Sequence, residues 1–175
     1  MMLNGEDYDA RVIQGKLGEK QILDVLRKAG IKIAEPTDEE DIKDKIDGWM
    51  EWDGTTVAVQ VKFRESGDDV LFECMKDIDR GITGRDMRCK AEYYLVKDRT
   101  GKIRMFLVRE LKTKVAGFID LVLNEHRRNP SVKAWGSVSA PINVKVVFDK
   151  CHGNRKLIAY FNPKTLKCLG EWTHD

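Results

Sequence analysis

The chain has 175 residues, of which 42% are hydrophobic and 34% charged, and this composition is typical of one globular domain with a core rather than of a disordered chain. No apolar run approaches the roughly 20 residues that span a bilayer. The polar, acidic start lacks the basic-then-apolar order of a signal peptide, so we expect a cytoplasmic protein without a membrane partner. The formal net charge of +2 permits a nucleic-acid partner without requiring one.

The first predicted element is a helix from about residue 9 to residue 29, closed by Gly30. Apolar residues such as Ile22 and Leu26 recur in it at helical spacing and predict a core-facing stripe. Glu19 falls three positions before Ile22 and seven before Leu26, at the edge of that stripe or on it. Spacing alone leaves open whether its carboxylate reaches water or points inward to a partner.

A short strand is predicted over residues 31–34, followed by the acidic stretch 35–44. Pro36 and Thr37, placed before several acidic residues, predict a capped helical turn. The spacing of an EF-hand loop is absent. We therefore interpret the negative charges of this stretch as a solvated face rather than a metal cage.

Residues 45–64 predict a β-hairpin, because Asp53-Gly54 is a preferred two-residue turn and strand-forming residues flank it. The turn fixes the register of the two strands. On the apolar face, expected to be the core, the pairs are Trp52–Thr55, Met50–Val57, Gly48–Val59 and Ile46–Val61, and Phe63 continues that face. On the other face the pairs are Trp49–Ala58, Asp47–Gln60 and Lys45–Lys62.

The second face of this hairpin carries the groups that metal-dependent phosphodiester cleavage needs. A hard divalent cation takes oxygen ligands, and a positive group offsets the charge that develops on the phosphate. Asp47 supplies a carboxylate, Gln60 a neutral amide oxygen, and Val61 a backbone carbonyl. Lys62 is suited to orienting or deprotonating the attacking water and to stabilising the pentavalent phosphorane. Glu19, if it faces inward, completes the set.

After the hairpin, residues 69–80 predict a helix and residues 81–90 a loop. The inward-facing residues expected in that helix are Leu71, Phe72, Met75 and Ile78. A strand pair is then expected over residues 91–96 and 103–108, a helix over 109–124, and a final hairpin over 142–148 and 156–161. This order predicts an α/β fold with a mixed central sheet of about four or five strands flanked by helices. We expect one domain over 1–175, with a core over about 9–125 and an elaboration over about 126–175.

The string "GEKQILDVLRKAG" with Glu19, the string "KIDGWM" with Asp47, and the strand "QVK" at residues 60–62 resemble the PD-(D/E)xK nuclease superfamily. This superfamily includes restriction enzymes, Holliday-junction resolvases and phage recombination nucleases, and the resemblance covers roughly residues 15–115. It implies a restriction-endonuclease-like core with a four-stranded mixed sheet, dependence on Mg²⁺ with Mn²⁺ able to substitute, and a nucleic-acid substrate. We expect an endonuclease acting on DNA. The resemblance also allows a homodimer, although no sequence feature identifies a dimer face.

One residue departs from the superfamily pattern, because Gln60 stands where an Asp or Glu is usual. Losing a negative charge should weaken metal affinity, so a second interpretation is an inactive nucleic-acid-binding or assembly module that keeps the fold. Lys62 argues for activity, since a free lysine beside Asp47 and Gln60 has no obvious structural use. A third interpretation is a structural protein without a site.

Basic residues after the hairpin are candidates for nucleic-acid contacts. Arg64 continues the face of Gln60 and Lys62 and is suited to contact a phosphate. Arg85, Arg88 and Lys90 are candidates for contacting a nucleic-acid backbone. The competing interpretation for all of them is an ordinary solvated strand end or loop.

Overall fold

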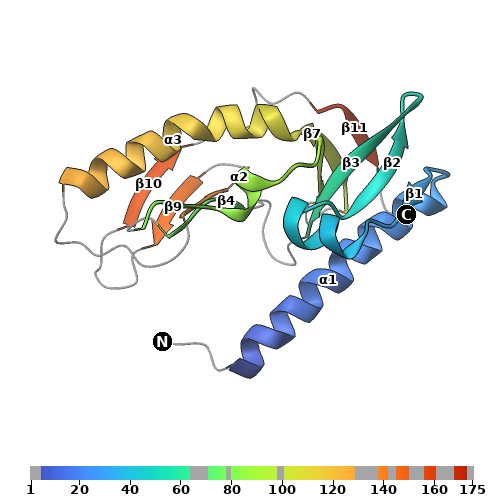
Figure 1. Ribbon diagram of the computed structural model, residues 1–175, viewed down its shortest axis with the longest axis horizontal. Helices are drawn as coiled ribbons and strands as arrows, with labels where there is room; N and C mark the ends of the chain where they lie inside the picture. The colour runs from blue at the N-terminus through green and yellow to red at the C-terminus, as the bar shows by residue number, and fades with distance from the viewer. Residues whose placement is uncertain are drawn as a thin grey trace.

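The computed structural model describes residues 5–63, 71–77, 80–97, 101–128, 138–141, 145–149, 156–160 and 168–172. Within these residues the strands form a six-stranded sheet, in the order β1-β2-β3-β6-β7-β11, and a five-stranded sheet, in the order β10-β9-β8-β4-β5 (Figure 1). The strands of the six-stranded sheet are β1 (Ile33–Ala34), β2 (Gly48–Trp52), β3 (Thr55–Lys62), β6 (Tyr93–Lys97), β7 (Ile103–Leu107) and β11 (Gly170–Trp172). The predicted mixed α/β class is confirmed, with more strands than expected.

The six-stranded sheet is mixed because β3 and β6 run parallel, whereas the other neighbouring strands are antiparallel. The predicted pairing of β6 with β7 is confirmed. The sheet extends beyond the expected four or five strands because β11, far along the chain, adds to the edge at β7.

Helix α1 (Gly5–Lys28) covers one face of this sheet. Its Ile22 and Leu26 are buried among apolar residues of β2, β3, β6 and β7. Gly30, with φ of 88°, ends the helix as predicted. The N–H of Gly30 donates to the Arg27 carbonyl and that of Ile31 to the Leu26 carbonyl, which is the Schellman arrangement.

The opposite face is covered by β4 (Leu71–Asp77) and by helix α3 (Val108–Arg128). Phe72 of β4 and Leu111 of α3 are fully buried with Tyr94 and Ala58 of the sheet. The predicted helix over residues 109–124 is therefore confirmed within α3. Strand β3 has apolar layers on both sides, and every residue from Val57 to Lys62 is buried.

The predicted hairpin is confirmed in its turn and in its register from the pair Gly48–Val59 to the pair Trp52–Thr55. The strand pairs expected before Gly48 (Asp47–Gln60, Ile46–Val61 and Lys45–Lys62) are not formed, because β2 begins only at Gly48. Asp53 and Gly54 have positive φ angles of 49° and 76°, as a two-residue hairpin turn of the primed kind requires. The strand pairs Gly48–Val59, Trp49–Ala58, Met50–Val57, Glu51–Thr56 and Trp52–Thr55 are those that the turn predicted. The expected position of Ile46 is wrong, because it packs in the cluster of Ala58 and Tyr94, on the side opposite Met50.

The helix predicted over residues 69–80 is wrong, since Leu71–Asp77 is the strand β4. It lies between β5 (Ile82–Thr83) and β8 (Val138–Pro141), and both pair with it antiparallel. The spacing of its apolar residues also fits one face of a helix. The segment is extended because it pairs with strand β8, more than 50 residues away, and such tertiary contacts override local propensity. Ile78 lies outside the described residues.

Residues 81–90 were expected as a loop, but they contain β5 and the short helix α2 (Arg85–Arg88). The C-terminal hairpin is confirmed as β9 (Lys145–Asp149) paired antiparallel with β10 (Lys156–Tyr160). No helix in the described parts of the chain is long and apolar enough to cross a membrane.

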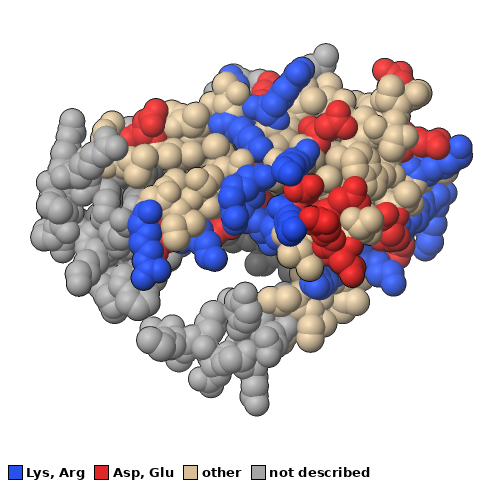
Figure 2. Space-filling model, in the orientation of Figure 1, with Lys and Arg blue, Asp and Glu red and all other residues tan. Residues whose placement is uncertain are grey.

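The acidic stretch forms the helical turn that was predicted, which continues as the π-helical segment η1 (Glu40–Asp44). Thr37 and Glu40 cap it reciprocally: Glu40 Oε2 accepts from the Thr37 N–H at 2.8 Å, and Thr37 Oγ1 accepts from the Glu40 N–H at 3.3 Å. Figure 2 shows the acidic side chains gathered over this segment, beside basic side chains over α2.

Candidate functional site

The site lies where η1 leads into β2, at the end of β3. Lys45 takes a left-handed conformation with φ of 59°, which turns the chain out of η1. The Ile46 N–H then donates to the Glu40 carbonyl at 3.1 Å, and the Asp47 N–H donates to the Val59 carbonyl at 2.8 Å. These bonds hold Asp47 against the last residues of β3, just before β2 begins.

One carboxylate oxygen of Asp47 accepts hydrogen bonds from two donors of β3. Oδ2 accepts from Gln60 Nε2 at 2.7 Å and from the Val61 N–H at 2.6 Å. The predicted neighbourhood of Asp47 and Gln60 is therefore present. Burial raises the pKa of Asp47 to about 6, although the bond from Val61 and the charge of Lys62 act in the opposite direction.

Glu19 of α1 and Asp47 line one pocket of about 370 Å³. The spacing of residues left open whether the Glu19 carboxylate points to water or inward. In the structure Glu19 is partly buried and points inward, into this pocket. Burial, followed by the negative charge of Asp47, raises the pKa of Glu19 to about 7. The other residues that line the pocket are Lys16, Lys20, Leu23, Arg27, Glu35 and Asp41.

Lys62 is 7% exposed in its side chain and pairs with Asp86 of α2, which is 1% exposed. Their Nζ and Oδ1 atoms lie 3.0 Å apart, in an orientation that leaves both without a hydrogen bond among the described residues. Asp86 Oδ2 accepts from the Glu73 N–H of β4 at 2.6 Å. The sequence-based argument that Lys62 has no structural use is therefore wrong, because this ion pair joins β3 to α2 and β4.

Two further groups surround Gln60 and Lys62. Gln60 Oε1 lies 3.5 Å from Cys89 Sγ, which donates to it. Tyr94, opposite Gln60 on β6, is fully buried, and its Oη has no hydrogen-bond partner within the described part of the chain. Lys62 Nζ lies 5.9 Å from the centre of the Tyr94 ring. The buried Tyr94 hydroxyl, which has no hydrogen-bond partner among the described residues, therefore belongs to a residue that lies beside Gln60 and close to the ion-paired Lys62.

The structure places the predicted nucleic-acid contacts in different ways. Arg85 is half-exposed, lies 3.7 Å from Asp86, and is close enough to Glu19 for the two charges to interact. Arg88 is exposed at the end of α2. Lys90 pairs with Asp44 at 2.7 Å. Arg64 lies outside the described residues.

Sequence reasoning missed Asp86 and the basic residues of α1 that line the Glu19 pocket. Asp86 follows Gly84 within a segment expected to be a loop, and an acidic residue in the first turn of a helix was its only local signal. Lys16 and Lys20 flank Glu19 on α1 and line its pocket, and neither was singled out from the sequence.

The donor set fits a hard divalent cation in chemistry. Glu19 and Asp47 contribute carboxylates to the same pocket, and Mg²⁺ prefers oxygen ligands of this kind. The amide nitrogen of Gln60 points to Asp47 in this structure. The amide would have to rotate before its oxygen could bind a cation beside Asp47. Among the described residues, no three His, Cys, Asp or Glu side chains gather as a metal cluster, and the donors above include only two such side chains.

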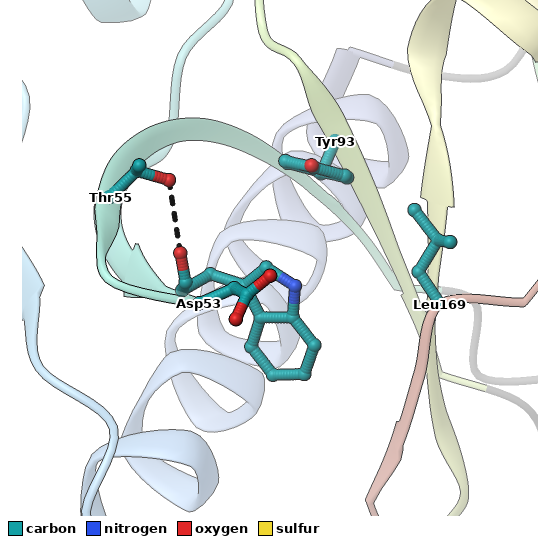
Figure 3. A pocket seen from close by; sticks show the side chains of 5 residues that line it. Asp53, Thr55, Tyr93 and Leu169 are labelled. Carbon is teal, nitrogen blue, oxygen red and sulfur yellow. Dashed lines mark hydrogen bonds between the residues drawn. The ribbon is translucent and has the colours of Figure 1, made fainter.

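A second pocket, of about 580 Å³, lies at the other end of β3, beside the hairpin turn (Figure 3). It is lined by Trp52, Asp53, Thr55, Tyr93 and Leu169, and Thr55 Oγ1 donates to the Trp52 carbonyl at 3.0 Å. The rings of Trp52 and Trp172 meet edge to face with centroids 5.4 Å apart. The Glu19 pocket and this pocket share no lining residue, so they are separate features.

No protein-family model, curated protein or solved structure matches the chain. What the site does therefore has to follow from the geometry of its own residues.

Proposed function

We propose that the protein is a Mg²⁺-dependent nuclease that hydrolyses phosphodiester bonds in DNA as an endonuclease, with a restriction-endonuclease-like core. The observation that carries the proposal is that Asp47 is bonded directly to Gln60 and Val61 while sharing a pocket with Glu19. The neighbouring strands β1, β2, β3 and β6, with β3 and β6 parallel, are compatible with the four-stranded mixed sheet that such a core contains.

In this proposal Glu19, Asp47, the Gln60 amide oxygen and the Val61 carbonyl hold the cation. When bound, the cation would polarise the phosphate and lower the pKa of a bound water. Desolvation raises the pKa of both carboxyl groups, and a cation would relieve that penalty by favouring their charged forms. The side chains therefore form a site in which negative charge is costly until a cation is bound.

Lys62 would offset the charge that develops on the phosphate, as a preorganised positive group does. Its partner Asp86 restricts where its Nζ atom lies, because the pair spans 3.0 Å inside the protein. Asp86 is in turn fixed by the Glu73 N–H. We therefore assign Asp86 as a positioning residue for Lys62 in the proposed reaction.

A specific observation favours the second candidate function, an inactive nucleic-acid-binding or assembly module. Gln60 donates a hydrogen bond to Asp47, and Asp86 pairs with Lys62, so three of the proposed active groups, Asp47, Gln60 and Lys62, already have partners inside the protein. In an inactive descendant these interactions would serve stability alone. The two candidate functions predict different results: only the nuclease should bind a divalent cation at this site and cut nucleic acid.

The test is cleavage of labelled duplex, single-stranded and branched DNA, and of RNA, with Mg²⁺, with Mn²⁺ and with EDTA. Wild type is compared with Asp47→Asn, which keeps the size of the side chain and removes its charge. The matched control is Asp53→Asn, the same change at the hairpin turn, where asparagine also tolerates a positive φ. Circular dichroism confirms that all three proteins are folded.

Metal-dependent cutting of DNA that falls at least about 100-fold in Asp47→Asn, but not in Asp53→Asn, would support the nuclease. Equal cutting by wild type and Asp47→Asn would overturn the site. Binding of oligonucleotides without cutting under any of these metal conditions would overturn the nuclease in favour of the binding module.

A further inference from the structure

A third pocket, of about 580 Å³, lies between α2 and the start of α3, and four positively charged side chains line it. We call it the basic pocket. Those side chains are Arg88, Lys90, Arg109 and Lys112, and the other lining residues are Cys89, Ala91, Glu92, Tyr93, Leu107 and Val108. Figure 2 shows basic side chains gathered in a band over α2 and the start of α3. Like charges held this close favour an anion between them.

Three of the four cations have no carboxylate partner in the described residues, and two of these three, Arg88 and Arg109, are exposed. Lys112 Nζ donates to the Cys89 carbonyl at 2.6 Å, which fixes one wall of the pocket. Lys90 pairs with Asp44 at 2.7 Å. Two guanidinium groups are therefore available to a ligand, and guanidinium groups match phosphate oxygens in pairs.

The single carboxylate that lines the basic pocket does not cancel this charge. Glu92 is one negative charge against four positive ones, and its Oε2 already accepts from the Ala58 N–H of β3 at 3.1 Å. Apolar groups complete the lining, with Tyr93 and Leu107 on neighbouring strands. A phosphate ester with an attached sugar fits this mixture of cationic and apolar walls better than a free inorganic anion would.

The basic pocket adjoins the proposed catalytic site through Cys89. The Cys89 Sγ atom lies 3.5 Å from Gln60 Oε1, and the same residue lines the basic pocket. On the other side, Arg88 lies three residues after Arg85 on α2, and Arg85 lies 3.7 Å from Asp86. Positive charge thus continues along α2 from Arg85, beside the Lys62–Asp86 pair, to Arg88 in the basic pocket.

We propose that the basic pocket binds a backbone phosphate of the nucleic-acid strand, next to the phosphate that is cleaved. The proposal rests on the nuclease function and names the residues that hold its substrate. In this proposal Arg88 and Arg109 hold the phosphate oxygens, and Lys112 supports the wall between the two sites. Arg109 and Lys112 were not among the basic residues predicted from the sequence to contact nucleic acid. Binding to phosphates fixes the position of the strand without reading its sequence.

The experiment measures binding of a fluorescein-labelled 20-nucleotide single strand, and of the matching duplex, by anisotropy in EDTA, so that no cleavage occurs. The variants are Arg88→Ala, Arg109→Ala and the double variant, and Arg109→Lys tests whether charge alone suffices. The control is Lys28→Ala, which removes an exposed cation at the end of α1 that lines neither the basic pocket nor the Glu19 pocket. Inorganic phosphate is titrated separately by calorimetry.

We expect the double variant to bind at least one form of the oligonucleotide about tenfold or more weakly, with Lys28→Ala unchanged. The slope of log K against log salt should become shallower by roughly 0.7 to 0.9 for each phosphate that the variant no longer neutralises. Unchanged affinity in the double variant would overturn the proposal. Tight binding of inorganic phosphate without binding of either oligonucleotide would overturn it in favour of a small phosphate ligand.

The outcome is separable from that of the nuclease test. Weaker binding by the double variant, together with no cleavage by wild type, would leave the basic pocket as a nucleic-acid site and remove the nuclease. Cleavage that depends on Asp47, together with unchanged binding by the double variant, would leave the nuclease and remove the basic pocket.

Discussion

Gln60 Nε2 donates a hydrogen bond to Asp47 Oδ2 at 2.7 Å. A glutamate at position 60 would instead place a second carboxylate beside that of Asp47, and the two would repel each other. Gln60 is 4% exposed, so its amide relies on protein partners rather than on bulk water. An amide at this position stabilises the site without a cation, whereas a carboxylate there would require one. If the proposed cation site is present, the residue at position 60 should therefore determine how strongly stability depends on metal.

The substitution Gln60→Glu should make stability depend on metal. In EDTA it places two carboxylates side by side inside the protein and should lower the free energy of unfolding by about 2–3 kcal/mol. With millimolar Mn²⁺ we expect much of that stability to be recovered, since the cation neutralises the pair. Thermal melts of wild type and variant, with and without Mn²⁺, measure both effects.

The control is Gln60→Met, which removes the amide without adding charge. It should also be destabilising in EDTA, because Asp47 loses a donor, but Mn²⁺ should not restore it preferentially. Equal stability of wild type and Gln60→Glu in EDTA would show that the two side chains do not touch.

The ion pair between Lys62 and Asp86 should show strong coupling between its partners. Lys62→Met removes the closer cation from the buried carboxylate of Asp86 and leaves only the half-exposed Arg85, 3.7 Å away. This change should cost up to about 3–5 kcal/mol. Asp86→Asn keeps an acceptor for the Glu73 N–H but removes the charge. In the double variant the cost should be less than the sum of the two single costs, by at least about 1 kcal/mol. Urea denaturation of the four proteins measures the cycle.

An exposed ion pair provides the comparison. Lys43 Nζ lies 2.7 Å from Glu39, and both side chains are more than 70% exposed. Lys43→Met should change stability by less than about 0.5 kcal/mol, because water already screens the pair. Strictly additive costs for Lys62 and Asp86 would contradict a direct interaction between them.

Stability without metal should fall as the pH rises toward neutrality. The folded-state pKa of Glu19 is about 7 against an ordinary value of 4.5, so the folded chain binds this proton more tightly than the unfolded chain. Its stabilising contribution is present below about pH 4.5 and is lost as the pH rises toward about 7. Because the side chain is partly exposed, we expect a loss of about 1–2 kcal/mol from this group.

The measurement is urea denaturation in EDTA at several values between pH 5 and pH 8. Glu19→Gln should flatten the decline, and the remainder should reflect Asp47, whose pKa of about 6 is also raised by burial. A Glu19→Gln protein with the same pH dependence as wild type would place the titrating group elsewhere.

Gly18 allows α1 to approach the end of β3, and a larger residue there should be disruptive. A Cβ atom on Gly18 would overlap the Phe63 ring, so Gly18→Ala should cost about 2–3 kcal/mol. It should also weaken cleavage, because α1 carries Glu19. Gly15→Ala is the control, since a Cβ there meets nothing within 4 Å; it should be neutral or stabilising by up to about 1 kcal/mol.

Thermal melts compare the two alanine variants, and Phe63→Ala is combined with Gly18→Ala to test for rescue. If the clash is the cause, the double variant should lose less stability than the two single changes added together. Equal melting temperatures for Gly18→Ala and Gly15→Ala would contradict the close approach of α1.

Sequence alone determined the features that a few adjacent residues encode. Asp53-Gly54 fixes a two-residue turn, the turn fixes the register of β2 and β3 as far as Gly48–Val59, and this register leaves Asp47 within reach of Gln60. Gly30 ends α1 for the same kind of local reason, since its positive φ is costly for other residues. In each case the relevant backbone angles and hydrogen bonds lie within a few residues of the signal.

Only the tertiary structure decided the conformation of β4 and the partners of the buried charges. Strand β4 depends on β8, more than 50 residues further along, and a helical stripe could not reveal that partner. Lys62 meets Asp86, 24 residues away, because both are withdrawn from water when β3, β4 and α2 pack together. How far a charged group is desolvated depends on the whole fold, so the spacing of residues along the sequence cannot predict which buried charges pair.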